Sequence, residues 1–292
     1  MSDPAHEARQ RLVGIALMSG ALVCFACLDA MAKFLNGHMD TLQVVWARYT
    51  GALIFAVAIS NPFAHPGLMV SRRPLLQVGR SLLLLLSTLL NFFALRFLQL
   101  DQAMAIVFST PFFVAMLSGP VLGEWVGWRR WTAICVGFLG VLLVARPGFG
   151  GIHPAALISL AAAAAYAAYS IATRMLARTD SSETTLFYSN LVGAAVMLPA
   201  VPFVWTTPRE PVVIVLMVVC GAFGTVGHYL LIMAHRLAPP ALLAPFIYGQ
   251  IVWAIFLGYL VFGNVPSRWT LAGAAIVVVS GLYILYRERK VR

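Results

Sequence analysis

The sequence has 292 residues, of which 61% are hydrophobic and only 10% are charged, and its mean hydropathy is +0.88. A soluble domain carries about 25% charged residues, so this composition lacks the polar residues needed to cover a water-exposed surface. The net charge of +10 does not indicate nucleic-acid binding, because the basic residues lie between apolar segments and form no basic run. We therefore expect an integral membrane protein with the lipid bilayer as its solvent and no nucleic-acid partner.

The first apolar run extends from Leu12 to Leu28. It is too long for a cleaved signal peptide, no small-residue cleavage site follows it, and the segment before it is polar and mixed in charge. We expect this run to be the first membrane span.

The rest of the chain divides into apolar segments separated by turn signals such as Asn61-Pro62, Pro147-Gly148 and Pro239-Pro240. A spanning helix needs about 20 mostly apolar residues. The predicted spans are residues 12–35, 41–60, 74–95, 101–122, 131–146, 154–177, 183–203, 211–235, 241–262 and 269–286. The fold class is therefore an all-α integral membrane protein of ten transmembrane helices.

The lysines and arginines orient these spans. With the N-terminus inside, fourteen of the 20 basic residues fall on the inner side. The positive-inside rule then places both termini in the cytoplasm, which requires an even number of spans. We expect a multi-pass protein of the inner (cytoplasmic) membrane.

The two halves of the chain resemble each other at one constant offset in residue number. The matching positions are Ala94-Leu95-Arg96 with Ala234-His235-Arg236, Asp40 with Asp180, and Gly123-Glu124 with Gly263-Asn264. Five spans per half is an odd number, so the second copy enters the membrane inverted. Inverted repeats are typical of secondary transporters, which hold substrate where the halves meet. We predict two inverted five-helix repeats, residues 1–148 and 149–292, around a central cavity.

Residues 103–144 resemble the signature of the EamA branch of the drug/metabolite transporter (DMT) superfamily. The matching features are a helix with Pro111, an ending at Gly123-Glu124, and a following helix with Gly137 and Gly140. The second half carries a weaker copy, with Pro245 displaced and Asn264 in place of the acid. The resemblance covers essentially the whole chain. Its length and layout are similar to those of YddG-type exporters, which implies export of amino acids, aromatic ones among them.

Enzymatic motifs do not fit this chain. The two lysines, Lys33 and Lys290, follow no phosphate-binding glycine-rich loop, and no HExxH zinc motif occurs. Asp29 is the one acid well inside a predicted span, so paired catalytic carboxylates are not supplied there. We expect no enzymatic activity, no cofactor and no metal site.

Four charges are candidates for structural or coupling roles. Asp29 and Lys33 are one helical turn apart and could pair, although an intramembrane ionisable residue is also a functional candidate. Arg48 could bind Asp29 or a substrate carboxylate. Glu124 could titrate, or could pair with the arginines that follow it.

Polar residues in the spans predict a cavity. His228 follows a glycine face formed by Gly221, Gly224 and Gly227, and it could sense protons or simply bond a neighbouring hydroxyl. The helix kinks expected at Pro111 and Pro245 would turn backbone carbonyls towards a shared cavity, or would merely shape packing. The predicted cavity residues are Thr88, Asn91, Ser109, Tyr166, Tyr169, Ser170, His228, Tyr248, Gln250 and Trp253.

The sequence thus favours a secondary exporter of amino acids, aromatic and other neutral ones, or related metabolites, working as a monomer by alternating access. The alternatives are a carrier of nucleotide sugars or drugs and a non-transport membrane protein. Few intramembrane acids argue against cationic drugs, since a buried cation needs a carboxylate.

Overall fold

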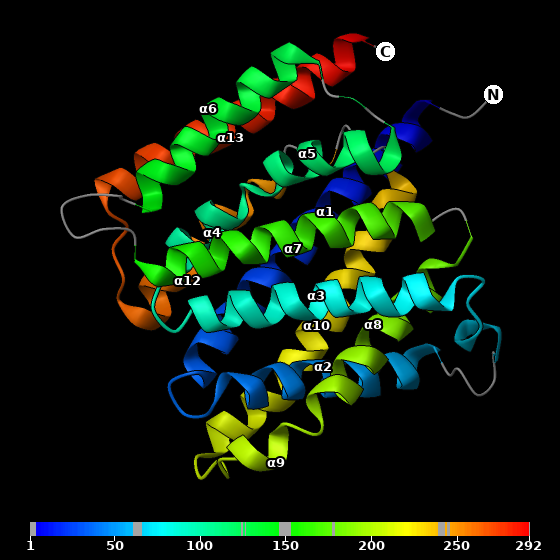
Figure 1. The fold of residues 1–292 in the computed structure, drawn as a ribbon, viewed down its shortest axis with the longest axis vertical. Helices are drawn as coiled ribbons and strands as arrows, with labels where there is room; N and C mark the ends of the chain where they lie inside the picture. The colour runs from blue at the N-terminus through cyan, green and yellow to red at the C-terminus, as the bar shows by residue number, and fades with distance from the viewer. Residues whose placement is uncertain are drawn as a thin grey trace.

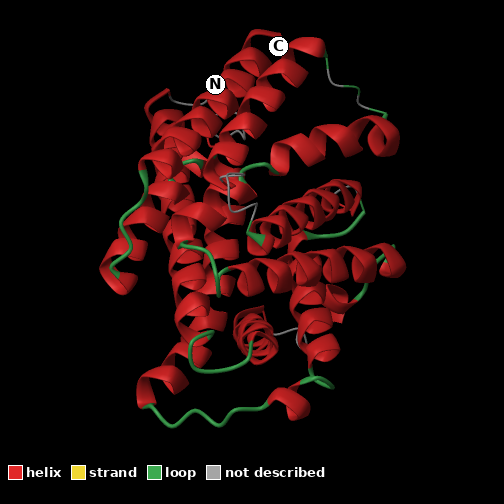
Figure 2. Ribbon diagram, turned by 60° about the vertical axis from the view of Figure 1, so that its left-hand side comes forward, coloured by secondary structure: helices red, strands yellow, loops and turns green. Residues whose placement is uncertain are grey.

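The structure is entirely helical where it is described. The computed structural model describes residues 4–60, 66–123, 125, 127–145, 153–176, 179–238, 243 and 246–291. Within these ranges every regular element is a helix, as Figures 1 and 2 show. The predicted all-α class is confirmed for this part of the chain.

Helix boundaries agree with most predicted spans. The first half contains α1 (Pro4–Leu35), α2 (Thr41–Ser60), the 3₁₀ helix η1 (Pro66–Met69), α3 (Pro74–Ala94), α4 (Leu100–Val107), α5 (Thr110–Leu122) and α6 (Trp128–Ala145). The second half contains α7 (Pro154–Leu176), α8 (Ser182–Met197), α9 (Val201–Val204), α10 (Pro211–Leu237), α12 (Gln250–Phe262) and α13 (Arg268–Val291). The predicted fourth span is thus divided into α4 and α5, and the predicted seventh span ends early at α8 and is followed by the short α9.

Proline and glycine set several of these boundaries. Proline lies in the first turn of α3, α5 and α10. A backbone N–H at this position has no acceptor within the helix, so proline, which lacks the N–H, removes no helical hydrogen bond. Helices α5 and α12 end at Gly123 and Gly263, whose φ angles are 72° and 66°. Only glycine adopts this left-handed conformation without strain. The two glycines occupy matching positions of the two halves, so the repeat ends its corresponding helices in the same way.

Six described segments are long and apolar enough to cross a bilayer by themselves. They are Arg9–Leu35, Thr41–Ala58, Pro74–Ala94, Leu100–Leu122, Pro154–Leu176 and Pro211–Leu237. Three shorter apolar helices are Trp131–Val144, Gln250–Phe262 and Arg268–Tyr283. The chain is therefore a multi-pass membrane protein, while the count of ten spans and the cytoplasmic placement of both termini stay predictions.

The helices cross between two faces of the molecule. In Figure 1 the starts of α1 and α3 and the end of α7 lie to the right, and the connections α1–α2, α3–α4 and α12–α13 lie to the left. Helices α1 and α10 pack along each other, as do α3 and α7, and α6 and α13.

Contacts between the halves follow the repeat. The offset that aligns Gly123 with Gly263 equates α1 with α7, α2 with α8, α3 with α10, α5 with α12 and α6 with α13. Each contact between the halves should therefore have a counterpart in which every helix is replaced by its equivalent. The α1–α10 contact corresponds to α7–α3, the α2–α10 contact to α8–α3, and the α1–α12 contact to α7–α5, and all of these contacts are present. The α2–α8 and α6–α13 contacts each join a helix to its own equivalent in the other half. The halves are intertwined, and their shared interface forms the interior. The predicted boundary between residues 148 and 149 lies outside the described residues and stays a prediction.

Candidate functional site

A cavity of about 500 Å³ lies between the two halves. Small-molecule sites usually enclose about 300–1,000 Å³ and are mostly apolar with a few placed polar groups. The lining residues are Phe25, Leu28, Asp29, Arg48, Leu84, Ser87, Thr88, Asn91, Phe92, Met104, Val107, Phe108, Thr110, Pro111, Ala162, Tyr166, His228, Ile247, Tyr248, Gln250 and Gly281. They come from helices of both halves, so a ligand bound here would contact both.

The residues that line the cavity differ in how far they are buried. Phe92 and Met104 are 2% and 8% exposed and belong to the main hydrophobic core. Tyr166 and Ile247 are each 39% exposed. The lining therefore combines buried core residues with residues that are partly exposed.

A glycine face on α10 positions His228. A Cβ added at Gly221 would lie 2.5 Å from the Ala52 nitrogen of α2, and one at Gly227 would lie 2.8 Å from the Phe25 ring of α1. Neighbouring helices therefore pack closely against Gly221 and Gly227, whereas the nearest atom to a Cβ at Gly224 would be 4.0 Å away. His228 follows directly and meets the Phe25 ring edge-on, with ring centroids 5.0 Å apart. The histidine consequently reaches the cavity wall beside an aromatic ring.

Asp29 and Arg48 both reach the cavity, but they do not form an ion pair. The Asn91 side-chain amide donates to Asp29 at 3.2 Å, and the Arg48 guanidinium donates to the Thr88 hydroxyl at 3.4 Å. Among the described residues, no carboxylate oxygen lies within 4.0 Å of the Arg48 guanidinium. Arg48 also lies over the Tyr49 ring, 4.5 Å from its centroid. Of the two partners considered for Arg48, Asp29 is therefore not in direct contact.

Lys33 does not form the ion pair with Asp29 that the sequence suggested. Its ammonium donates to the carbonyls of Leu95 and Leu98 at 2.8 and 2.6 Å, and it lies 5.6 Å from the Phe262 ring centroid. The pair with Asp29 is not formed. These two carbonyls lie at the C-cap of α3 and in the connection that follows it, where carbonyls lack helical donors, and the long lysine side chain reaches them from α1. Lys33 therefore joins α1 to the end of α3.

The helix breaks lie at equivalent places. Between α4 and α5 the Ser109 amide donates to Ile106 at 2.9 Å, and before α12 the Gly249 amide donates to Phe246 at 2.8 Å. These are i→i−3 bonds, which mark a tightened and interrupted helix. The first break precedes Pro111, which lies in the first turn of α5, and Pro245 lies outside the described residues. The Phe108 and Tyr248 rings meet at these breaks, with centroids 5.3 Å apart.

Six of the ten predicted cavity residues line the cavity. They are Thr88, Asn91, Tyr166, His228, Tyr248 and Gln250. Their role in substrate binding stays a prediction.

The other four predicted cavity residues lie elsewhere. Ser109 lines a much smaller adjoining pocket, and the Ser170 hydroxyl donates to the Tyr166 carbonyl of its own helix at 2.9 Å. The guanidinium of Arg80 lies over the Tyr169 ring, and Trp253 is 38% exposed on α12. None of these four residues is part of the cavity lining. Glu124 lies outside the described residues.

Several lining residues were not predicted, among them Phe25, Leu28 and Gly281. In lipid, an apolar side chain serves equally well on the outside of a bundle or against a cavity. Sequence polarity therefore gives no signal that separates these positions from their neighbours.

Arg80 of α3 is a further buried charge that was not predicted as a site residue. It is 1% exposed, and its guanidinium donates to Thr173 at 3.2 Å, to the Thr185 carbonyl at 2.6 Å and to the Ser189 hydroxyl. It lies over the Tyr169 ring, 4.9 Å from the centroid. Arg80 thus joins α3 of the first half to α7 and α8 of the second.

Asp180, in the turn after α7, forms a second link between the halves. It accepts hydrogen bonds from the Ser71 hydroxyl, from the Arg72 amide at 3.0 Å and from the Gln77 side chain at 2.9 Å. Burial alone would raise the pKa of Asp180, but these hydrogen bonds outweigh that effect and hold the pKa below its ordinary value.

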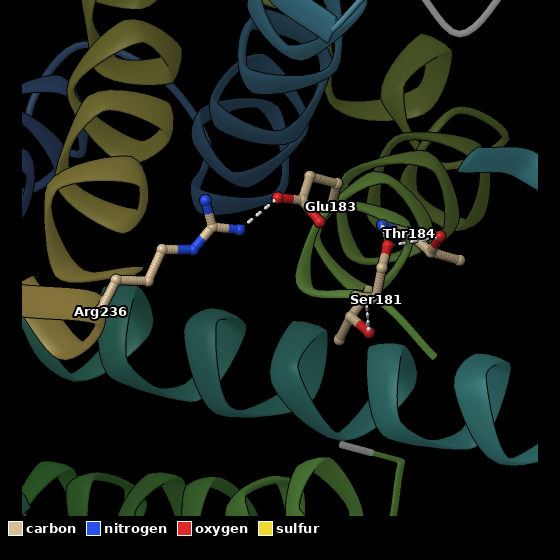
Figure 3. Close-up of polar contacts among 5 residues, drawn as sticks. Ser181, Glu183, Thr184 and Arg236 are labelled. Carbon is tan, nitrogen blue, oxygen red and sulfur yellow. Dashed lines mark hydrogen bonds and ion pairs between the residues drawn. The ribbon is translucent and has the colours of Figure 1, made fainter. Parts of the chain in front are cut away.

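The beginning of α8 is held on both sides, as Figure 3 shows. The Ser181 hydroxyl accepts from the Thr184 amide at 3.1 Å, which caps the helix. Arg236, near the end of α10, donates to Glu183 at 2.7 Å. The α7–α8 turn is therefore fastened to α3 through Asp180, and the start of α8 to α10 through Glu183.

A multi-pass helical bundle whose two halves enclose a partly polar cavity has the architecture of a membrane carrier. The profile of the EamA-like transporter family matches residues 12–146 and again residues 153–287. The chain belongs to the EamA-like transporter family. It is a transporter of the DMT type, as the sequence resemblance predicted. Among the described residues, no group of three or more His, Cys, Asp or Glu side chains is placed to hold a metal ion.

Relatives carry different substrates. The chain is similar to an S-adenosylmethionine uptake transporter of Rickettsia bellii, with 28% identity over 281 residues that cover 95% of each protein. It is 30% identical to a riboflavin transporter of Vibrio cholerae over 190 residues, covering 65% of this chain and 63% of the relative. It is 25% identical to a pseudopaline exporter of Pseudomonas aeruginosa over 273 residues, covering 91% and 94%.

One solved crystal structure shares the fold, with a TM-score of 0.68 at 18% identity, over 96% of this chain and 98% of the other. The relatives' names do not support the narrower resemblance to YddG-type amino-acid exporters. That resemblance rested on length and layout, and the relatives align with this chain over nearly its whole length while carrying other substrates.

Proposed function

We propose that this protein is a secondary transporter of amino acids, aromatic and other neutral ones, or of metabolites derived from amino acids. In this proposal it exports them across the cytoplasmic membrane by alternating access between two inverted halves. The observation that carries the proposal is the cavity of about 500 Å³ lined from both halves. A ligand that contacts both halves senses their relative position, which is what alternating access requires.

The chemistry of the lining favours a small amphiphilic substrate. Phe25, Phe92 and Tyr166 supply aromatic surface, while Asn91 and Gln250 supply amide groups. An apolar wall with a few placed polar groups is the usual composition of a site for a small organic molecule. An amino acid with an aromatic or aliphatic side chain suits this combination.

S-adenosylmethionine is a second candidate, because it combines an amino-acid group with a flat heteroaromatic ring and a cationic sulfur. Asp29 provides a carboxylate at the cavity wall for a cation, and aromatic rings of the lining suit a flat ring. Relatives of similar length carry that substrate in their names. Nucleotide sugars and drugs remain the broader alternatives.

The test is counterflow in proteoliposomes that contain the purified protein. Vesicles loaded with unlabelled L-phenylalanine, L-tryptophan, L-methionine or S-adenosylmethionine are diluted into the labelled compound. Accumulation above empty liposomes that saturates and is competed by unlabelled substrate is expected for at least one compound. Repeating the assay with and without a pH gradient distinguishes proton exchange from facilitated transport, and sided reconstitution gives the direction. Failure of all four compounds with folded, inserted protein would contradict the proposal and direct the assay to riboflavin, nucleotide sugars and drugs.

A further inference from the structure

The Arg48 guanidinium has unused hydrogen-bonding capacity. It is 8% exposed, yet within the described part of the chain its one hydrogen bond to a side chain is the long contact to Thr88, and its Nε has no partner there. A guanidinium has five N–H donors and matches a carboxylate with two parallel bonds. A buried charge of this kind is unfavourable unless an opposite charge approaches it. Because Arg48 lines the cavity, a bound anion could supply that charge.

Asp29 is complementary to Arg48. It accepts a hydrogen bond from Asn91, and an ionised carboxylate can accept about four. Among the described residues no Lys, Arg or His nitrogen lies within 4.0 Å of it. A bound cation could therefore occupy the remaining acceptor positions.

Helix α3 binds each of these two charges through a different residue. Thr88 and Asn91 are three residues apart, which places them on one face of α3. Thr88 holds Arg48 of α2, and Asn91 holds Asp29 of α1. Each charge is thus oriented by a neutral residue instead of by the other charge. A ligand with one charge would leave the opposite wall group unpaired, whereas a ligand with both charges satisfies both.

We propose that the cavity recognises the α-amino-carboxylate group of its substrate, with Arg48 binding the carboxylate and Asp29 binding the ammonium. The substrate's side chain would then lie against the aromatic lining that includes Phe25 and Tyr166. This inference rests on the proposed transport of amino acids or their derivatives, and it assigns the two protein groups that bind the charges of the zwitterion.

The test measures binding by the purified protein in lipid nanodiscs, separately from transport. The probes are L-phenylalanine, phenethylamine, which lacks the carboxylate, and 3-phenylpropionate, which lacks the ammonium. S-adenosylmethionine and its decarboxylated form make a second pair. We expect a zwitterionic parent to bind at least about tenfold more tightly than each analogue, which corresponds to one lost charged contact. This comparison uses the unmodified protein, so it does not depend on any variant folding.

Two variants then assign the charges. Arg48→Gln should abolish the preference for L-phenylalanine over phenethylamine and keep the preference over 3-phenylpropionate. Asp29→Asn should abolish the preference for L-phenylalanine over 3-phenylpropionate and keep the preference over phenethylamine. Arg96→Gln and Glu210→Gln make the same chemical changes at exposed positions outside the cavity and should leave both preferences unchanged.

The outcomes separate this inference from the proposed function. Transport of a compound without discrimination between a zwitterion and its analogues would overturn the zwitterion site and leave the carrier function intact. Selective binding without counterflow would support the site and count against the carrier function. Equal weakening of all probes by both cavity variants, or binding of neither parent, would overturn the inference.

Discussion

The aromatic rings of Phe108 and Tyr248 meet edge to face, with centroids 5.3 Å apart and planes at 71°, and the two residues occupy equivalent positions in the two halves. Each lies at the break of an interrupted helix, and both line the cavity. The ring contact therefore joins the two breaks directly. In a carrier whose halves move relative to each other, such a contact would couple one break to the other.

Because Gly281 of α13 has no side chain, it leaves room for the side chain of Tyr248. A Cβ at position 281 would collide with the Tyr248 ring and hydroxyl. We expect Gly281→Ala to displace the tyrosine and to lower stability by about 1–3 kcal/mol, as overpacking does. The double variant Gly281→Ala, Tyr248→Ala should regain part of that loss, because the truncated side chain leaves room. Thermal unfolding in detergent measures both effects, and Tyr248→Phe shows what the hydroxyl alone contributes. A double variant less stable than Gly281→Ala would refute this account.

Helices α6 and α13 cross at a pair of glycines. A Cβ at Gly140 would lie 2.7 Å from the Gly273 carbonyl oxygen, and one at Gly273 would lie 2.5 Å from the Gly140 carbonyl oxygen. Since both obstacles are backbone atoms, we expect Gly140→Ala or Gly273→Ala to cost about 1–3 kcal/mol. Gly79→Ala is the matched control, because open space surrounds that helical glycine, and it should be neutral or stabilising by about 0.4–1 kcal/mol. Equal melting temperatures for all three variants would contradict the predicted close crossing.

Lys33 and Asp29 should act independently despite their spacing of one turn. Lys33→Met removes the donors to Leu95 and Leu98, and we expect a loss of about 1–3 kcal/mol. Asp29 has a different partner, Asn91. A double-mutant cycle with Asp29→Asn, followed by chemical denaturation, should therefore be additive within about 0.5 kcal/mol. A coupling energy well above that value would restore the Asp29–Lys33 pair that the sequence predicted.

The Asp180 link should make stability depend on pH. The pKa of Asp180 is lowered in the folded protein by its hydrogen bonds, so its stabilising contribution is full above the unfolded pKa of about 3.9 and is lost as the pH falls through the folded value. We expect Asp180→Asn to lower the melting temperature at pH 6 and the difference from the native protein to narrow below about pH 4. The control is Asp40→Asn, the equivalent position of the first half, where the carboxylate accepts a hydrogen bond from the nearby Leu42 amide. A difference that stays constant down to pH 3 would contradict the role of the ionised carboxylate.

The sequence by itself determined the class of protein and much of its layout. Lipid offers no partners for backbone N–H and C=O groups, so long apolar segments must be helices. Prolines and glycines then mark helix ends with little dependence on their surroundings, as Pro74, Pro211, Gly123 and Gly263 show. The repeat was visible for the same reason, because its ends are punctuated alike in both halves.

Only the tertiary structure decided which side chains meet. Lys33 has a possible partner one turn away on its own helix, but it binds the end of α3, which no local pattern records. Phe108 and Phe25 look like any other apolar residues of a span until neighbouring helices enclose them around the cavity. Ser170 is polar and was predicted to line the cavity, yet its hydroxyl donates to a carbonyl of its own helix. The physical reason is that lipid and protein interior are equally apolar, so sequence polarity fixes that a helix spans the membrane but not which of its faces turns inward.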